Sequence, residues 1–263
     1  MRYKDLTEFK ETTGHEIAGI WYPRVTKILE VKSKPALQNF FREVGDYASV
    51  ESIKNKSAEE GTLLHKTIQD YLQGKLTEIP ESVKGAVTAF QKFNESKDII
   101  LHPEFVERPV WSIRHRYSGT VDALATIDGK FGVLDIKTST GFYPEYNLQT
   151  SAYASALREF EIKKRLGLAH EIETRWILRI DQQRSCRKCG ASLREKGGRK
   201  KIRFGRVGKS AVCPEDEHEW GEMKGEVAIR EFPYYYKDFR AFVAAKILWE
   251  WENDYWLKQA GYL

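Results

Sequence analysis

YSGTVDALATIDGKFGVLDIKTSTGFYPEYNLQTSAY, residues 117–153, is the stretch of this sequence that decides the fold. It opens with two strand-like runs, residues 117–127 and 131–139, joined by Asp128-Gly129. An Asp-Gly pair between two alternating runs is typical of a β-hairpin with a two-residue turn. We therefore expect two antiparallel strands here, followed by a helix that begins near residue 146.

The turn also sets the register of the predicted hairpin. With Ile127 opposite Lys130, Asp122 falls opposite Asp135, and Lys137 points to the same face as Asp135. Two carboxylates that face each other repel, so a fold that accepts this pair usually has a cation to relieve it. Oxygen ligands at this separation suit Mg²⁺ or Mn²⁺. The alternative is a surface hairpin with ordinary exposed ion pairs.

The same residues carry a family resemblance. Gly119-x-x-Asp122, Asp135-x-Lys137 and Gln149-x-x-x-Tyr153 together resemble the PD-(D/E)XK nuclease superfamily, and within it the RecB-like exonuclease branch. The resemblance implies an α/β fold of the restriction-endonuclease type, with a mixed central sheet flanked by helices. It also implies an enzyme, a Mg²⁺- or Mn²⁺-dependent deoxyribonuclease that hydrolyses phosphodiester bonds.

The resemblance assigns roles to individual residues. The metal ligands would be His65, Asp122, Asp135 and the carbonyl of Ile136, since Gly61-x-x-x-His65 matches the histidine-bearing helix of this branch. The catalytic residues would be Asp122, Asp135, Lys137, Gln149 and Tyr153, with Lys137 on the attacking water and the last two placing the DNA strand. From the residues alone, a single helical histidine is more often structural. Gln149 and Tyr153 could likewise be ordinary residues at the edge of the buried face of a helix.

Near the N-terminus, residues 23–29 (PRVTKIL) come ahead of a short predicted helix. They resemble the corresponding part of exonucleases such as the mitochondrial genome maintenance exonuclease. Arg24 stands where that group has a small residue, and its charge makes it a candidate phosphate contact, with a buried segment as the alternative. Thr138 and Ser139 could add hydroxyl donors to a phosphate.

Basic residues are concentrated in one segment. The 263-residue chain has a net charge of +5, but residues 182–209 contain eleven Lys and Arg against one acid, Glu195. That segment is therefore +10 and the rest about −5, an asymmetry that indicates a polyanionic partner. We predict DNA contacts from Arg199, Lys200, Lys201 and Arg203. A solvated surface loop is the alternative.

The three cysteines lie close to this basic run. Cys186-x2-Cys189-x23-Cys213-x4-His218 has a ribbon-like zinc spacing, which predicts a structural Zn²⁺. A redox pair or a decayed knuckle remains as an alternative. CRISPR-associated members of the RecB-like branch hold an iron–sulfur cluster, but that pattern needs an additional N-terminal cysteine which this chain lacks. We therefore expect a nuclease domain over residues 1–181 and 225–263, and a basic, zinc-binding insert over 182–224.

The remaining patterns predict other elements and a location. Helices are expected over 57–73, 81–96, 146–164 and 236–256, and strands over 105–112, 173–181 and 225–231. The aromatic stripe of the last helix is expected in the core. No apolar run approaches the roughly 20 residues of a membrane helix, and the N-terminus has no apolar signal segment, so we expect a cytoplasmic protein.

Three functions fit these patterns. The first is a DNA exonuclease acting on single-stranded ends in repair, recombination or replication, alone or within a larger complex. The second keeps the chemistry but makes it endonucleolytic, as in trimming or flap cutting. The third is a non-catalytic DNA-binding protein on the nuclease scaffold.

Overall fold

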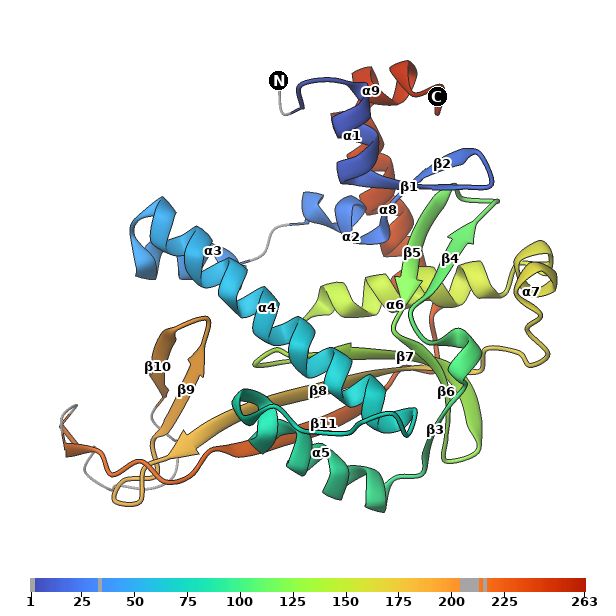
Figure 1. Cartoon of the computed structure of the whole chain (residues 1–263). Coiled ribbons are helices and arrows are strands. Elements are labelled where there is room, and N and C mark those ends of the chain that lie inside the picture. The colour runs from blue at the N-terminus through green and yellow to red at the C-terminus, as the bar shows by residue number, and fades with distance from the viewer. Residues whose placement is uncertain (1–2, 33–34, 204–212, 215–216) are drawn as a thin grey trace.

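The computed structural model of the chain describes residues 3–32, 35–203, 213–214 and 217–263, with the backbone alone for 35–37 (Figure 1). Its helices are α1 (Leu6–Thr13), α2 (Val25–Ile28), α3 (Pro35–Val44), α4 (Tyr47–Leu72), α5 (Lys84–Ser96), α6 (Pro144–Leu157), α7 (Phe160–Leu166), α8 (Tyr236–Glu252) and α9 (Asp254–Gln259). Its strands are β1 (Gly14–Ile17), β2 (Ile20–Pro23), β3 (Ile99–Leu101), β4 (Arg108–Ser112), β5 (Tyr117–Val121), β6 (Ala123–Ile127), β7 (Lys130–Lys137), β8 (Thr174–Ser185), β9 (Ser192–Lys196), β10 (Arg199–Arg203) and β11 (Lys224–Glu231).

A mixed sheet forms the centre of the molecule. Within the described residues it has seven strands in the order β10-β9-β8-β7-β6-β3, and β11 also pairs with β8. The β7–β8 pair is parallel, and the other pairs are antiparallel. The predicted α/β class and mixed sheet are confirmed.

The hairpin turn is confirmed, and so is the inner part of its register. Asp128 and Gly129 have φ values of 50° and 79°, as a type I′ turn requires. The β6–β7 ladder runs from Ile127↔Lys130 to Ala123↔Leu134.

The predicted outer part of the hairpin is wrong. The run expected over 117–127 bends at Asp122, and β5 pairs with β4, so that Thr120 lies opposite Pro109. The physical reason lies in two hydrogen bonds that Asp122 accepts. Its carbonyl accepts from Glu107 N at 3.1 Å, and its Oδ2 accepts from Ile136 N at 2.6 Å.

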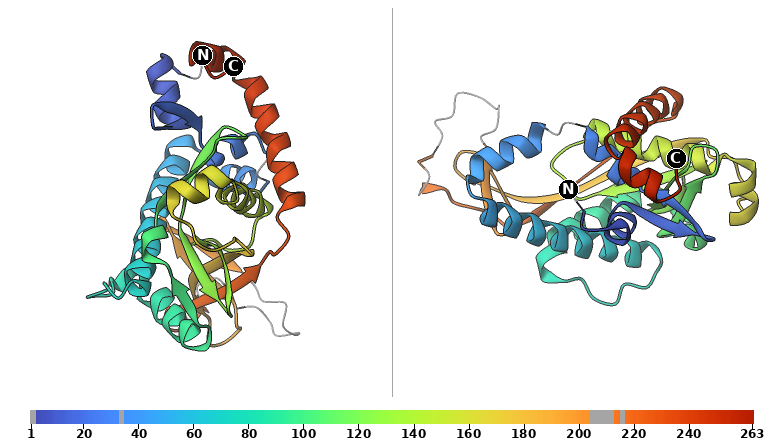
Figure 2. Two further views of the ribbon diagram at one scale, coloured as in Figure 1. Left: turned by 90° about the vertical axis from the view of Figure 1, so that its right-hand side faces the viewer. Right: turned by 90° about the horizontal axis from the view of Figure 1, so that it is seen from above.

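Helices cover both faces of the sheet (Figure 2). Helix α6, with α8 beyond it, packs on the face that presents Leu124 and Val133. Helices α4 and α5 pack on the other face, where Leu134 and Ile136 are buried with Ile68 of α4. The alternation along β7 places Asp135 and Lys137 on the same side as Val133, toward α6.

Three predicted helices have different bounds. Helix α4 begins at Tyr47, ten residues before the expected start, because the side chain of Asp46 caps it by accepting from Ser49 N at 2.8 Å. The helix expected over 146–164 is split into α6 and α7, since the Glu159 carboxylate at the break accepts from Ile113 N and Arg114 N. The tail helix is split at Asn253.

The aromatic stripe of the tail is only partly in the core. Phe239 and Phe242 are buried as expected, but Trp251 is 76% exposed and Ile247 is 62% exposed. The physical reason is geometric, since Trp249 occupies the inward face of α8 against Phe9 and leaves Trp251 outside. No helix in the described part of the chain is long and apolar enough to cross a membrane.

Candidate functional site

The centre of the candidate site is a carboxylate and an amine on β7. Asp135 is 1% exposed, and its Oδ1 accepts a hydrogen bond from Lys137 Nζ at 2.8 Å. Its second oxygen, Oδ2, is buried with no hydrogen-bond partner among the described residues. An unpaired buried carboxylate oxygen is costly, so this atom marks a place where a cation would be stabilised.

Burial controls the protonation of this pair. Burial raises the pKa of Asp135 to about 7, although the Lys137 charge beside it acts in the opposite direction. For Lys137, burial by itself would lower the pKa, but the charges of Asp135 and Asp122 raise it above the usual lysine value. Lys137 therefore stays protonated at physiological pH, which suits a hydrogen-bond donor and not a base.

Asp122 lies beside this pair, held by the bend between β5 and β6. Its Oδ2 accepts from Ile136 N and lies 3.0 Å from His65 Nε2. Burial would raise the pKa of Asp122, but the His65 hydrogen bond and the Lys137 charge lower it below its usual value. The N–H and C=O of a strand residue point to the same side, so the Ile136 carbonyl faces the Asp122 side.

Helix α4 brings His65 to the strand. Gly61, one turn earlier, permits the close approach, because a Cβ there would lie 2.8 Å from Thr138 Oγ1. Burial acts to lower the pKa of His65, but hydrogen bonding and charge from Asp122, with the Glu107 charge, raise it. Metal-free His65 is therefore charged more readily than a free histidine, and a cation would have to displace its proton.

Glu107 belongs to the same cluster and was not predicted. Its Oε1 lies 3.6 Å from His65 Nδ1 and accepts from Gln69 Nε2 at 2.7 Å. Glu107 has φ of 49°, which is uncommon outside glycine. No sequence motif marks it, because it sits in the turn before β4, far from the hairpin in the chain.

These residues fit a divalent cation. His65, Glu107 and Asp122 each offer one ligand atom, and these atoms lie within 4.8 Å of one another. Asp135 is not in that group, so the predicted set of His65, Asp122 and Asp135 is only partly assembled. The two carboxylates are donors that suit Mg²⁺ or Mn²⁺, and His65 would add one nitrogen ligand. If His65 Nε2 and Asp122 share the ion, His65 Nδ1 is left to Glu107, which then acts as the carboxylate that orients a metal-bound histidine.

Gln149 and Tyr153 stand together on α6, one turn apart. Gln149 Nε2 donates to the Tyr153 hydroxyl at 3.0 Å, and Tyr153 is buried. Burial raises the pKa of Tyr153, so it stays a neutral phenol. Gly119 leaves room for this ring, because a Cβ at residue 119 would overlap it. Gly119 of the Gly119-x-x-Asp122 pattern therefore makes room for Tyr153 of the Gln149-x-x-x-Tyr153 pattern.

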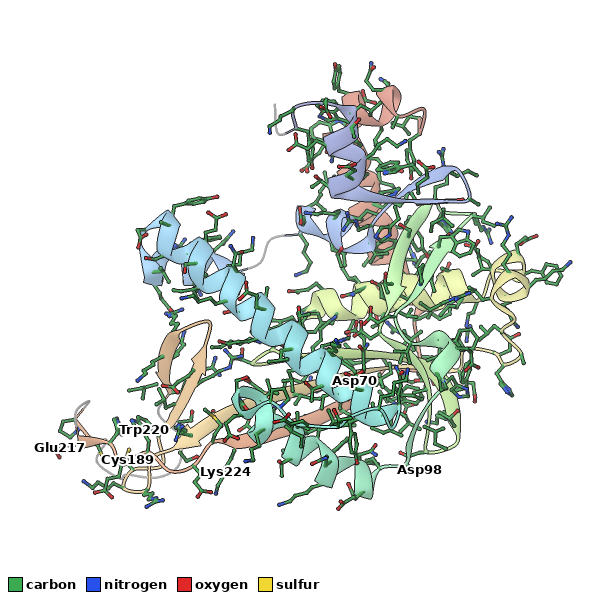
Figure 3. All side chains as sticks on the ribbon, in the orientation of Figure 1. Asp70, Asp98, Cys189, Glu217, Trp220 and Lys224 are labelled. Carbon is green, nitrogen blue, oxygen red and sulfur yellow. The ribbon has the colours of Figure 1, made fainter. Side chains whose placement is uncertain are left out.

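The cysteine cluster forms as predicted, at a separate place. Single ligand atoms of Cys186, Cys189, Cys213 and His218 all lie within 4.8 Å of one another, so the cluster could hold a structural zinc. Cys186 is bridged to Trp220 by backbone hydrogen bonding. Figure 3 shows Cys189 and Trp220 at one end of the molecule, far from Asp70 of α4.

The predicted DNA contacts have different environments. Arg24 is held by the carbonyls of Gly14 and Glu11, which favours the buried-segment alternative. Thr138 accepts from Lys196 Nζ through its carbonyl and its hydroxyl. Ser139, Arg199, Lys201 and Arg203 line one cavity of about 420 Å³, and Lys200 is not among its lining residues. The last part of the basic run, residues 204–209, lies outside the described residues.

Comparisons with known proteins give this geometry no family assignment. No protein-family model and no curated protein matches the sequence. A functional interpretation therefore depends on the positions and chemistry of the residues above.

The cysteine cluster predicts the metal content of the purified protein. We expect about one zinc per chain by elemental analysis, because three thiolates and an imidazole complete a tetrahedral site. Cys189→Ser and His218→Ala should lose most of it, whereas His170→Ala, an exposed histidine outside the cluster, should keep it. Iron with visible cluster absorbance, or no metal in the unaltered protein, would contradict this prediction.

Glu107 predicts an effect on metal affinity. Glu107→Gln should weaken Mn²⁺ binding about 10- to 100-fold in titration calorimetry, because it removes the charge that orients and polarises His65. Glu104→Gln, an exposed neighbour in the same loop, is the control and should bind Mn²⁺ as the unaltered protein does. Equal affinities for both variants would refute the role of Glu107.

Proposed function

We propose that this chain is a divalent-metal-dependent deoxyribonuclease of the PD-(D/E)XK type, with a restriction-endonuclease-like core. The observation that carries the proposal is the buried Asp135. One of its oxygens is bonded to Lys137, the other has no partner among the described residues, and the His65–Asp122 pair stands beside it. A merely structural carboxylate would be expected to have both oxygens satisfied.

The likeness to the nuclease superfamily supports this proposal through several elements at once. The acid and lysine stand on one strand, the second acid at the start of its hairpin partner, and the histidine on α4. Gln149 and Tyr153 come from α6 on the face toward which Lys137 points. Chain segments nearly ninety residues apart, from His65 to Tyr153, thus converge on the end of β7. Such convergence favours a shared chemical role over independent structural ones.

The proposed chemistry assigns each side chain a task. A bound Mg²⁺ or Mn²⁺ would polarise the scissile phosphate and activate a water. Asp122, Asp135, His65 and the Ile136 carbonyl would hold the ion. Lys137, protonated because two carboxylates surround it, would donate to the water or to the phosphate oxygen and offset charge there.

Gln149 and Tyr153 of α6 would position the substrate strand. The Gln149 amide already bonds the Tyr153 hydroxyl, so both groups are oriented before a substrate arrives. Preorganised donors lose little entropy on binding, which favours a positioning role for them. Thr138 and Ser139, which follow Lys137 directly, place two more hydroxyls at the same end of β7.

Among the nuclease activities, we favour an exonuclease that acts on single-stranded ends. Endonucleolytic trimming or flap cutting would use the same residues. A DNA-binding protein without catalysis is less well supported, because it gives no reason for the unpaired oxygen of Asp135. Circular single-stranded DNA separates the first two, since a strict exonuclease cannot begin on it.

The proposal predicts the loss of cleavage in two variants. Asp135→Ala and Lys137→Ala should reduce Mg²⁺-dependent digestion of linear single-stranded DNA by about 10²-fold or more, because each removes a group that touches the reacting centre. Lys130→Ala is the control, since Lys130 begins the same strand but forms an exposed ion pair with Glu231. Its activity should equal that of the unaltered protein.

The controls make the result decisive. Circular dichroism should show that both variants stay folded, and EDTA should abolish digestion by the unaltered protein. Undiminished cleavage by Asp135→Ala and Lys137→Ala would exclude these residues from catalysis.

A further inference from the structure

A basic groove lies between the β9–β10 hairpin and the long helix α4. Besides Ile53 and Ser57 of α4 it is lined by Phe40 of α3, by Ser139, Thr140 and Tyr143, and by six basic residues: Lys54, Arg194, Lys196, Arg199, Lys201 and Arg203. The hairpin lies beside the first half of α4 (Figure 1). It is fixed there because Gly197 N donates to both oxygens of Glu60, at 3.0 and 3.1 Å. The groove is thus a feature of the folded chain.

The hairpin is built to attract anions. Its register sets Arg199 opposite Lys196 and Lys201 opposite Arg194, which is two like-charged cross-strand pairs in five residues. Like charges directly opposite destabilise a two-stranded ribbon unless an anion lies between them. Carboxylates of the chain relieve this repulsion between like charges only in part. Asp181 pairs with Arg194, and no carboxylate of the described residues forms an ion pair with Lys196 or Arg203.

One contact shows what kind of group the groove accepts. The Glu43 carboxylate of α3 lies 2.5 Å from Arg199 and 3.1 Å from Lys201. The side chains of β10 that line the groove therefore already bind a pair of anionic oxygens. Phosphate diesters present the same kind of oxygens along a strand, and Arg favours them for its planar fork of donors.

The groove leads to the candidate catalytic centre. Ser139 and Thr140 on its wall follow Lys137 by two and three residues. Lys196 of β9 donates to the carbonyl and hydroxyl of Thr138, so the hairpin contacts the end of β7 directly. Burial and the Arg194 charge lower the pKa of Lys196 to about 8, as expected where cations gather with few anions.

Aromatic rings are interleaved with these cations. The Arg199 guanidinium carbon lies 5.3 Å from the centre of the Phe40 ring, and Tyr143 lines the same groove. Cationic grooves with aromatic platforms bind single strands, because a base can stack only after it leaves a duplex. A duplex presents phosphates but keeps its bases stacked inside.

We propose that a single DNA strand lies in the groove between α3, α4 and the β9–β10 hairpin, with its phosphates on Arg199, Lys201 and Arg203, a base on Phe40, and its path ending at Lys137. The inference takes from the proposed function only that the partner is DNA. It gives the insert a specific task, which is to hold the strand that the β7 end receives.

The test uses the alternation of β10. Arg199, Lys201 and Arg203 line the groove, whereas Lys200 between them points away and pairs with Glu195 at 3.4 Å. The groove variant is Lys201→Ala with Arg203→Ala. The control, Lys200→Ala with Lys224→Ala, removes the same charge, and Lys224 is exposed at the start of β11. All proteins also carry Lys137→Ala, so that bound DNA is not degraded.

The measurement is fluorescence anisotropy with a labelled oligothymidylate of about 15 nucleotides, at several salt concentrations. The groove variant should bind at least about tenfold more weakly. The slope of its log binding constant against log salt concentration should be shallower by about 1.4, because two phosphate contacts are lost. The control should bind within about twofold of its parent. Equal weakening of both variants, or equal affinity for a duplex of the same length, would overturn the proposal.

Phe40 gives a second, independent readout. Phe40→Leu keeps an apolar side chain but removes the ring, so single-strand affinity should fall at least about fivefold. Phe41→Leu, the exposed adjacent ring on α3, should leave it unchanged. No loss with Phe40→Leu would exclude stacking on this ring. Because these assays measure binding alone, absent cleavage by the unaltered protein would refute the nuclease and leave the groove result standing.

Discussion

The structure depends on one buried carboxylate and the charges needed to keep it there. Asp135 is on a strand with neighbours on both sides and helices on both faces, so water cannot satisfy it. Lys137 satisfies one oxygen, two positions along the same strand. Within the part of the chain that the structure describes, the other oxygen has no donor, and the surrounding elements bring acids and an imidazole near it. A purely structural interior would favour an apolar residue here, because leaving one oxygen of a buried carboxylate without a donor is costly.

The bend at Asp122 follows from the same constraint. A straight strand would have put two carboxylates in register with no donors between them. Instead the chain turns at Asp122, its carboxylate takes the Ile136 N–H, and β5 leaves the main sheet to pair with β4. This bend also brings Glu107 beside His65, since Glu107 N bonds the carbonyl of Asp122. One local break thus assembles residues from three separate segments.

Sequence reasoning reached the parts of this site that local patterns encode. The Asp-Gly turn and the alternation of β6 and β7 predicted the inner ladder of the hairpin, and the cysteine spacing predicted the Cys186–His218 cluster. The bend at Asp122 could not be predicted, because it depends on pairing with β4. Glu107 carried no signal, since its role depends on a turn with positive φ and on His65, forty-two residues earlier. The early start of α4 was missed because its first turns are largely exposed and lack an apolar stripe.

The strands of the basic insert continue the central sheet. Strand β8 carries the sheet through Ser185, and β9 and β10 extend it to α4. The cysteine cluster stands at the base of this extension, where a bound zinc would fix the hairpin beside α4. The alternation of side chains along β10 divides the basic run between two faces: Arg199, Lys201 and Arg203 line the groove, and Lys200 lies on the outer face.

The most direct test of the metal-centred account is a crystal structure of the protein soaked in Mn²⁺, with anomalous scattering recorded to locate the ion. We expect one or two peaks that lie within about 2.0–2.2 Å of oxygens of Asp122 and Asp135, with His65 completing the shell. The ion should contact Asp135 through Oδ2, with the Lys137 amine still bonded to Oδ1. A fully soaked crystal with no anomalous peak at these two carboxylates would contradict the account.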